Sequence, residues 1–339
     1  MSWLNKLFNK KRIFLDYASA TPVLPEVKQV MEKYWSREFY NPNAIYKEGV
    51  MVKRDVDEYR TKIARILDVA KETVVFTSGG TESNTWAIRG TRKHHAIIDE
   101  ASHPSVFEAA KGMDISTWNA SSPLFIRRNT ILISTVTTEN KIGRQVREWR
   151  KKNDTTLPLL HIDASQTAAY FNVGLEALSC DLLTLDSAKL YGPKGIGVLV
   201  IRKGVELEVP PIGTPAVPLI AGFAKALEIA VRDRESEHKR LELFSVEFME
   251  LIQQSLPQAL VTRSLPNVVH VSVPGILPEF LVLALDRAGI LVSTGFACNS
   301  NKPEPPDTPV RVSFGRFTTE KEARRAAKIF CLVCRSVIK

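Results

Sequence analysis

Four short segments of the sequence carry side chains or turns that could do chemistry. The first, FTSGGTESN, runs from an apolar stretch through Gly79 and Gly80 into a helical pattern. Glycines let the backbone approach an anion closely, and a helix N-terminus offers unpaired N–H donors and the positive end of the helix dipole. The segment therefore predicts a phosphate cradle, although similar turns occur in α/β folds that hold no ligand.

Two further segments place ionisable side chains at or shortly after the ends of apolar runs. LLHIDASQ delivers Asp163 and Gln166. A buried carboxylate is costly unless it is paired, so Asp163 is either a local helix cap or the partner of a protonated ring nitrogen in a cofactor. TLDSAKLYGPKG delivers Lys189. A lysine held in a pocket can lose its proton and form a Schiff base, whereas an isolated lysine is more often solvated.

The cysteines favour a reducing compartment and include one candidate nucleophile. The chain has 4 cysteines in 339 residues, too few for a disulfide scaffold, which favours a cytoplasmic protein. Cys298, in STGFACNSN, borders the proline-rich loop 299–309 and is a candidate nucleophile if it is exposed. Cys331 and Cys334 form a single C-x-x-C pair in a helical pattern, so we expect buried helix cysteines and no metal site.

Short apolar runs alternate with helical patterns in the first two thirds of the chain. This alternation predicts an α/β domain with a mostly parallel sheet. The expected strands are Thr73–Thr77, Ala96–Asp99, Thr130–Thr135, Leu157–Ile162, Asp181–Asp186 and Gly197–Arg202. The expected helices are Glu26–Trp35, Val50–Leu67, Glu82–Gly90 and Ser105–Lys111.

The pattern changes after Pro218, where one long helical stretch runs to Leu256. Strands and helices then alternate over shorter lengths, which predicts a second, smaller α+β unit. We therefore expect a large domain over residues 22–222 and a small domain formed by 1–21 and 223–339. The expected elements after residue 256 are strands Asn267–Val273, Ile290–Ser293 and Val310–Phe314, and helices Glu279–Ala288 and Thr319–Val337.

Composition and charge exclude several classes of protein. Hydrophobic residues make up 44% and charged residues 24% of the chain, a globular mixture that excludes disordered and collagen-like chains. The net charge of +9 favours acidic ligands, but the charges are scattered, so we expect no direct nucleic-acid binding. No apolar run is long enough to span a membrane. The basic residues 1–12 lack a signal-peptide core and are expected to form a helical lead-in, with weak surface attachment as the alternative.

Together these segments resemble the pyridoxal 5'-phosphate (PLP) dependent cysteine desulfurases of the NifS/IscS type. The resemblance begins at Ile13, ends at Ala323 and covers about nine tenths of the 339 residues. It includes the motifs NPNAIY, TSGGTESN, ASHPSV, HIDASQ, AKLYGPKGIG, STGFACNS and RVSFGRFTTE. It implies the type I PLP-dependent transferase fold of class V aminotransferases.

The resemblance implies a role for each residue at the cofactor. Lys189 would form the Schiff base, Asp163 would keep the pyridine nitrogen protonated, and Gln166 would bond the phenolic oxygen. His103 would stack on the ring and move protons. The implied phosphate contacts are Gly80 and Thr81, with Thr214 reaching the cofactor of the second subunit of a homodimer.

The resemblance also implies the reaction. L-cysteine would be converted to L-alanine, with Asn140 and Arg311 holding the substrate and Cys298 taking its sulfur as a persulfide. The sulfur would pass to an acceptor protein for iron–sulfur clusters or tRNA thiolation.

Several positions depart from the family pattern. Asp186 stands where a phosphate-binding serine is usual, and Ala188 stands where a histidine is usual. The segment 208–214 and the loop after Cys298 are also short. Three alternatives therefore stay open: a selenocysteine lyase, a class V aminotransferase, or a non-catalytic scaffold that binds partners. At single residues, His103 could instead cap a helix and Arg311 could form a structural ion pair.

Overall fold

The computed structural model divides the chain into two compact units. One comprises residues 22–232, and the other comprises residues 1–21 together with 233–339. The structure describes residues 12–91, 94–119, 122–136, 139–208, 210, 213–295 and 308–338. Both the boundary at residue 232 and the sequence-based one at 222 fall within one long helix, α8 (Val217–Ser255). The expected helical lead-in lies almost entirely outside the described residues.

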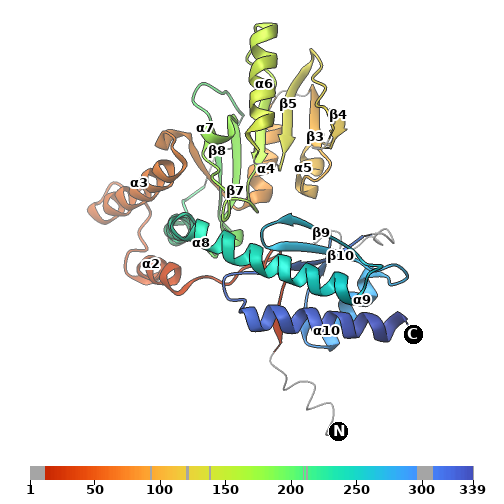
Figure 1. The fold of residues 1–339 in the computed structure, drawn as a ribbon. Helices are drawn as coiled ribbons and strands as arrows, with labels where there is room; N and C mark the ends of the chain where they lie inside the picture. Colours follow the sequence, from red (N-terminus) through yellow and green to blue (C-terminus); the bar gives the residue numbers. More distant parts are fainter. Residues whose placement is uncertain are drawn as a thin grey trace. The chain divides into compact units, whose positions relative to one another are not determined.

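The larger unit is built on a seven-stranded sheet (Figure 1), in the order β2-β8-β7-β6-β5-β3-β4. The strands are β2 (Val74–Thr77), β3 (His95–Asp99), β4 (Asp114–Trp118), β5 (Thr130–Thr135), β6 (Leu159–Asp163), β7 (Leu182–Asp186) and β8 (Gly197–Ile201). The pairs from β7 through β4 are parallel, whereas β8 runs antiparallel to both of its neighbours. The sheet is therefore mostly parallel, as the alternating pattern predicts.

Helices bury the apolar strands of this sheet. They are α2 (Pro25–Ser36), α3 (Lys47–Leu67), α4 (Gly80–Arg89), α5 (Pro104–Ala109), α6 (Asn140–Asn153) and α7 (Leu175–Leu178), with 3-10 turns η1 (Lys71–Thr73) and η2 (Ser187–Lys189). Ile88 of α4 and Val106 of α5 are fully buried in one cluster with Ile98 and Leu132 of the strands. Such burial stabilises the fold by about 1.5–3 kcal/mol for each large aliphatic side chain.

The smaller unit combines helices with an antiparallel sheet in the order β12-β13-β10-β9. Its elements after α8 are β9 (Leu260–Leu265), β10 (Val268–Ser272), α9 (Pro278–Arg287), β11 (Ile290–Leu291), β12 (Ser293–Thr294), β13 (Val310–Ser313) and α10 (Glu320–Ile338). The N-terminal strand β1 (Ile13–Phe14) pairs in parallel with β11. The expected strand Ile290–Ser293 is thus two short strands, each with a different partner.

The two cysteines of the C-x-x-C pair lie inside α10 and are buried, as predicted. Burial raises the pKa of the Cys334 thiol to about 12, which keeps it protonated. Among the described residues, no cluster of histidine, cysteine and carboxylate side chains could hold a metal ion.

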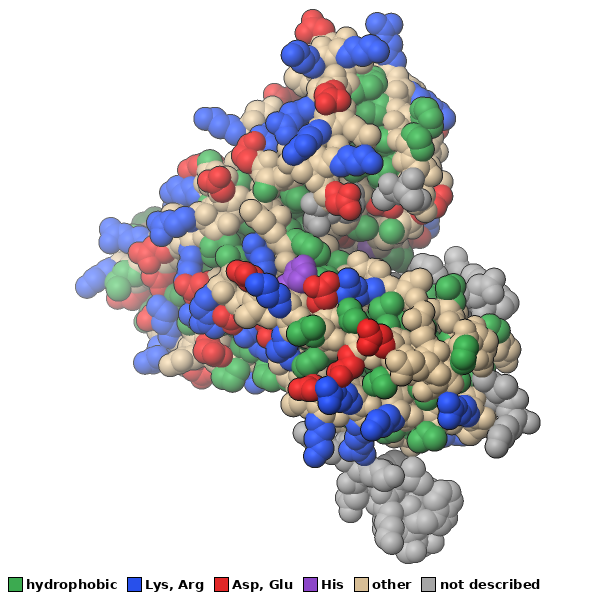
Figure 2. All heavy atoms as spheres, in the orientation of Figure 1, with side chains coloured by type: hydrophobic (Ala, Val, Ile, Leu, Met, Phe, Trp, Pro, Cys, Tyr) green, Lys and Arg blue, Asp and Glu red, His purple; other side chains and the backbone are tan. Residues whose placement is uncertain are grey.

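Charges of both signs are interspersed over the face of the protein drawn in Figure 2. None of the described helices combines the length and the apolar character needed to cross a membrane.

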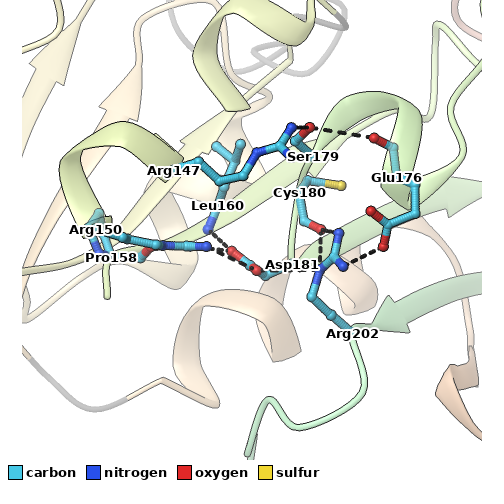
Figure 3. Close-up of polar contacts among 9 residues, drawn as sticks. All are labelled: Arg147, Arg150, Pro158, Leu160, Glu176, Ser179, Cys180, Asp181 and Arg202. Atoms are coloured by element: carbon cyan, nitrogen blue, oxygen red, sulfur yellow. Dashed lines mark hydrogen bonds and ion pairs between the residues drawn. The ribbon is translucent and has the colours of Figure 1, made fainter. Parts of the chain in front are cut away.

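A buried ion pair joins α6 to the sheet (Figure 3). The carboxylate of Asp181, 5% exposed, accepts hydrogen bonds from the Arg150 guanidinium and, at 2.7 Å, from the backbone N–H of Leu160. The guanidinium of Arg202 lies 3.6 Å from the same carboxylate and also binds the exposed Glu176. Asp181 therefore neutralises the positive charge of Arg150, whose side chain is only 16% exposed.

Replacing Asp181 by alanine is expected to lower the free energy of unfolding by about 3 kcal/mol, because the largely buried guanidinium of Arg150 would lose the negative charge that it pairs with. Urea denaturation followed by circular dichroism measures this change. The matched control is Glu176→Gln, whose side chain is 65% exposed and should cost less than about 1 kcal/mol. Equal losses in the two variants would contradict a special role for the buried carboxylate.

Candidate active site

The carboxyl ends of five strands meet at one edge of the seven-stranded sheet. The strands β3, β5, β6 and β7 are parallel, and β2 runs in the same direction because β2 and β7 are both antiparallel to β8. In α/β sheets, ligands bind outside this edge. The polar residues that end the five strands are Thr77, Asp99, Thr135, Asp163 and Asp186.

Asp163 is 8% exposed at the end of β6 and is held by two partners. Its Oδ2 accepts a hydrogen bond of 2.8 Å from the Asn84 side-chain amide. Its Oδ1 accepts one of 3.1 Å from the backbone N–H of Ser165, the local cap that the sequence left open as an alternative. The carboxylate is thereby fixed in direction, which a partner of a ring nitrogen requires.

His103 lies close to Asp163, Lys189 and Asp186. Burial lowers the pKa of His103, the negative charges of Asp163 and Asp186 raise it, and the positive charge of Lys189 lowers it. Its Nδ1 accepts a hydrogen bond of 3.1 Å from the backbone N–H of Ser105, so the expectation of a helix cap is also met, at the start of α5. Burial, the largest of these effects, thus favours the uncharged imidazole.

Lys189 ends the 3-10 turn η2 and is half-buried. It stands three residues after Asp186, the last residue of β7. The fold thus brings Lys189, Asp163 and His103, which are distant in sequence, to one edge of the sheet. Gln166 follows Asp163 in the turn after β6 and is half-buried.

The turn from β2 into α4 has the shape expected of an anion cradle. Gly79 has a φ of 150°, and Gly80 and Thr81 begin the helix. A Cβ atom on Gly197 would lie 2.7 Å from the carbonyl carbon of Gly79, so position 197 needs glycine for β8 to approach, whereas glycine at position 79 is favoured by its positive φ. The N–H of Gly80 donates a hydrogen bond of 3.2 Å to Oδ2 of Asp186.

Three other expected site residues, Asn140, Thr214 and Cys298, are not placed in the group around Asp163 by the described contacts. Asn140 begins α6, and its Oδ1 accepts a hydrogen bond of 3.0 Å from Ser179, which precedes β7 at the opposite end from Asp186. Thr214 is exposed. Cys298 lies outside the described residues. The structure therefore does not bring Asn140 to the group around Asp163.

Arg311 belongs to the smaller unit, on β13, with its side chain 11% exposed. Its guanidinium donates hydrogen bonds of 3.0 Å to Asp16 and 2.7 Å to Ser19, so it forms the structural ion pair considered above. Its buried Nε has no partner among the described residues, which leaves one donor for a further acceptor.

Comparison with known proteins decides the family. A profile described as "Aminotransferase class-V" matches residues 13–212 and 212–325. The chain belongs to the class V aminotransferase family. Its relatives include the "Cysteine desulfurase IscS" of Dictyoglomus turgidum, which is 32% identical over 354 residues, covering 91% of this chain and 90% of that protein. The "Cysteine desulfurase IscS 1" of Archaeoglobus fulgidus is 30% identical, covering 93% of this chain and 95% of that protein.

Solved structures agree with this assignment. The chain matches a "NIFS-LIKE PROTEIN" with a TM-score of 0.84 and 27% identity, over 96% of this chain and all of that one. It also shares its fold with the "Apo structure of Cysteine Desulfurase from Thermococcus onnurineus", at a TM-score of 0.77 and 19% identity. The resemblance to NifS/IscS proteins and the α/β fold inferred from the sequence are thus confirmed.

The class V aminotransferase family binds PLP, and the described residues fit the ring of that cofactor. Asp163 is a buried, oriented carboxylate, and His103 and Lys189 lie near it. The buried atoms Asn84 Oδ1 and Ser165 Oγ have no partner among the described residues, as expected where a ligand supplies one. At the phosphate end the fit is poorer, because Asp186 already holds the N–H of Gly80.

Sequence reasoning missed Asn84 and Ser165 as members of the site. Asn84 lies four residues after Gly80 on α4 and is 1% exposed. A buried asparagine one helical turn into a suspected anion-binding helix was the available signal, because a buried amide needs polar partners. Ser165 gave no such signal, since its position next to Gly80 depends on the pairing of distant strands.

His161, two residues before Asp163, is fully buried between β5 and β7. Its ring nitrogens bond Ser134 Oγ at 2.8 Å and Thr184 Oγ1 at 3.0 Å. Burial lowers the pKa of His161 to about 4, while the charge of Asp163 acts in the opposite direction. The strand that delivers Asp163 is therefore anchored by a neutral imidazole.

This anchor predicts a loss of stability in acid. An unfolded histidine has a pKa of about 6.5, so the unfolded chain binds the proton first as the pH falls. The contribution of His161 is complete above about pH 6.5 and declines by up to roughly 3 kcal/mol as the pH falls toward 4. Urea unfolding at several pH values, compared between wild type and His161→Gln, measures it. Identical pH slopes in the two proteins would contradict the assignment.

Proposed function

We propose that this protein is a PLP-dependent cysteine desulfurase that converts L-cysteine to L-alanine and takes the sulfur as a persulfide on Cys298. One observation carries the proposal: Lys189, Asp163 and His103 gather at the carboxyl edge of the sheet, with Asp163 oriented by Asn84. The relatives named cysteine desulfurase, which are 30–32% identical over more than 90% of the chain, support the choice of reaction within the family.

Bound PLP supplies an aldehyde that a lysine amine can bond and a ring that withdraws electrons from the α-carbon of an amino acid. Lys189 would be the amine that bonds the aldehyde, and its free amine could accept the α-proton. Asp163 would hold a proton on the ring nitrogen, because Asn84 fixes the direction of its carboxylate. Burial lowers the pKa of His103 and so favours its uncharged form, in which the imidazole could cover the ring and relay a proton.

The substrate side of the proposal rests on Arg311 and Cys298. The buried guanidinium of Arg311 has an Nε with no partner among the described residues, which suits a substrate carboxylate. The resemblance to the family also assigns Asn140 to the substrate, but the proposal does not rest on it, because Asn140 bonds Ser179 away from the group around Asp163. Cys298, as a thiolate, attacks the sulfur of L-cysteine: a new S–S bond forms as the C–S bond breaks, and the bonding electrons return to the substrate carbon.

Exposed apolar side chains support a homodimer. Trp35 is 59% exposed, Phe39 65% and Ile45 98%, and they lie within a short stretch that ends α2 and leads into α3. A second copy of the chain would cover them and would bring its Thr214 to the cofactor. We further propose that the enzyme acts in the cytoplasm and passes sulfur to an acceptor protein, an iron–sulfur scaffold or a tRNA-thiolating enzyme.

The test follows sulfur and alanine together. Wild-type protein with PLP and L-cysteine should form alanine and carry a persulfide on Cys298, identified by peptide mass spectrometry. Cys298→Ser should lose the persulfide and most of the sulfide release. Cys331→Ala, which removes a thiol buried in α10, is the matched control and should retain both.

Substrate comparison separates the alternatives. A preference for selenocysteine would favour a lyase for that substrate, and turnover of amino-acid and keto-acid pairs would favour transamination. If Cys298→Ser released sulfide as fast as wild type, the desulfurase proposal would be wrong.

A further inference from the structure

The carboxylate of Asp186 links the lysine turn to the start of α4. Its Oδ1 accepts a hydrogen bond of 2.8 Å from the backbone N–H of Ala188, next to Lys189. Its Oδ2 accepts one of 3.2 Å from the N–H of Gly80, the first residue of α4. Both oxygens of one half-buried side chain are thus engaged with backbone donors of the suspected phosphate cradle.

The cradle therefore already contains an anion that belongs to the chain. The N-terminus of a helix such as α4 carries a partial positive charge and attracts a negatively charged ligand. A Cβ atom built on Gly80 would lie 3.2 Å from Oδ2 of Asp186 and 3.0 Å from Oγ of Ser165. These two side chains line the cradle, and the buried Ser165 hydroxyl has no partner among the described residues. The cradle thus combines one open hydroxyl with one fixed negative charge.

A phosphate dianion placed against this carboxylate would meet like-charge repulsion, which offsets the attraction of the helix end. We propose that Asp186 competes with the phosphate of PLP for the N-terminus of α4, so that the protein binds PLP and its dephosphorylated form, pyridoxal, with similar affinity. This inference rests on the proposed function, because it assumes that the phosphate end of the cofactor faces α4.

Charge removal at Asp186 tests the proposal. Wild type, Asp186→Asn and Asp186→Ser would each be titrated with PLP and with pyridoxal by equilibrium dialysis. Asparagine keeps the shape and one acceptor oxygen, so the bond from Ala188 can persist. We expect PLP to bind at least about tenfold more tightly to both variants, with pyridoxal affinity unchanged within about twofold.

A matched carboxylate on the same helix turn provides the control. Glu82 accepts a hydrogen bond of 2.6 Å from the N–H of Ser78 and does not engage Gly80. Glu82→Gln removes one negative charge from this turn and should change PLP affinity by less than about threefold. Inorganic phosphate gives a readout that is independent of the cofactor ring: it should raise the melting temperature of the Asp186 variants and leave that of wild type unchanged.

The outcomes separate this inference from the function. If the affinities of both Asp186 variants for PLP stay within about twofold of wild type, or if wild type prefers PLP over pyridoxal by more than about 100-fold, Asp186 does not compete with phosphate. Borohydride reduction followed by mass spectrometry reports on Lys189 separately. An adduct on Lys189 with unchanged affinities overturns the Asp186 inference alone, whereas no adduct in any variant overturns the proposed function and this inference with it.

Discussion

Replacing Lys189 by alanine is expected to abolish borohydride-stable attachment of the cofactor and to lower alanine formation from L-cysteine by roughly 10⁴-fold. The variant loses the amine that bonds the cofactor and the base that takes the α-proton, and both losses act on the same reaction. Lys189 is half-buried at the end of η2. Mass spectrometry of reduced peptides and a chromatographic assay for alanine measure the two effects.

A second lysine, in the turn that follows η2, provides the comparison. Lys194 lies in the Gly-Pro-Lys-Gly turn five residues later and is exposed. Lys194→Ala should retain the adduct and keep turnover within about threefold of wild type. An adduct that persists in Lys189→Ala would show that another lysine holds the cofactor, and the assignment of the site would be wrong.

Replacing Asp163 by asparagine is expected to lower turnover by roughly 10³-fold. Two opposite unit charges about 4 Å apart attract by about 4 kcal/mol at an effective dielectric constant near 20, and each 1.4 kcal/mol is a factor of ten, so loss of the negative charge that would face a protonated ring nitrogen should have an effect of this size. Asparagine keeps the size of the side chain and can still accept a bond from Asn84, so the loss is one of charge. Steady-state kinetics measure it.

The same substitution has a second expected effect. The negative charge of Asp163 raises the pKa of His103, so its removal should lower that pKa further. NMR titration of the His103 ring would detect the change.

The control for the loss of turnover is Asp99→Asn at the end of β3, where the carboxylate is 2% exposed and accepts a hydrogen bond of 2.6 Å from Thr135 Oγ1. Asp99→Asn should cost stability and spare turnover within about tenfold. If both variants lost turnover equally, damage to the fold rather than loss of charge at the cofactor would explain the effect.

Much of the larger unit could be predicted because its signals are local. Strands buried on both faces produce continuous apolar runs, and the helices between them have a helical period. The strand Thr130–Thr135 was predicted at its observed bounds, and β2, β3 and β6 to β8 within two residues at each end. Lys189 and Asp163 could be chosen because Asp163 ends such a run and Lys189 lies three residues after the end of another.

Three of the longer elements that sequence reasoning missed, β4, β9 and α6, are rich in polar residues. The strand β4 lies at an edge of the seven-stranded sheet, and β9 lies at an edge of the smaller sheet, so neither needs an apolar run. The helix α6 buries only Ile142, Gly143 and Val146 and is otherwise polar. Their formation depends on partners elsewhere in the chain rather than on a strong local pattern.

The sequence by itself determined the family, the parallel sheet and the residue types at its carboxyl edge. Only the tertiary structure decided which of them meet. Asn84 reaches Asp163 across 79 residues, and Gly80 reaches Asp186 across 106. These contacts exist because the order of strands in the sheet places β2 two positions from β7, and strand order is a property of the folded chain. A substitution such as Asp186 is visible in the sequence, but its position on the N-terminus of α4 follows from this packing.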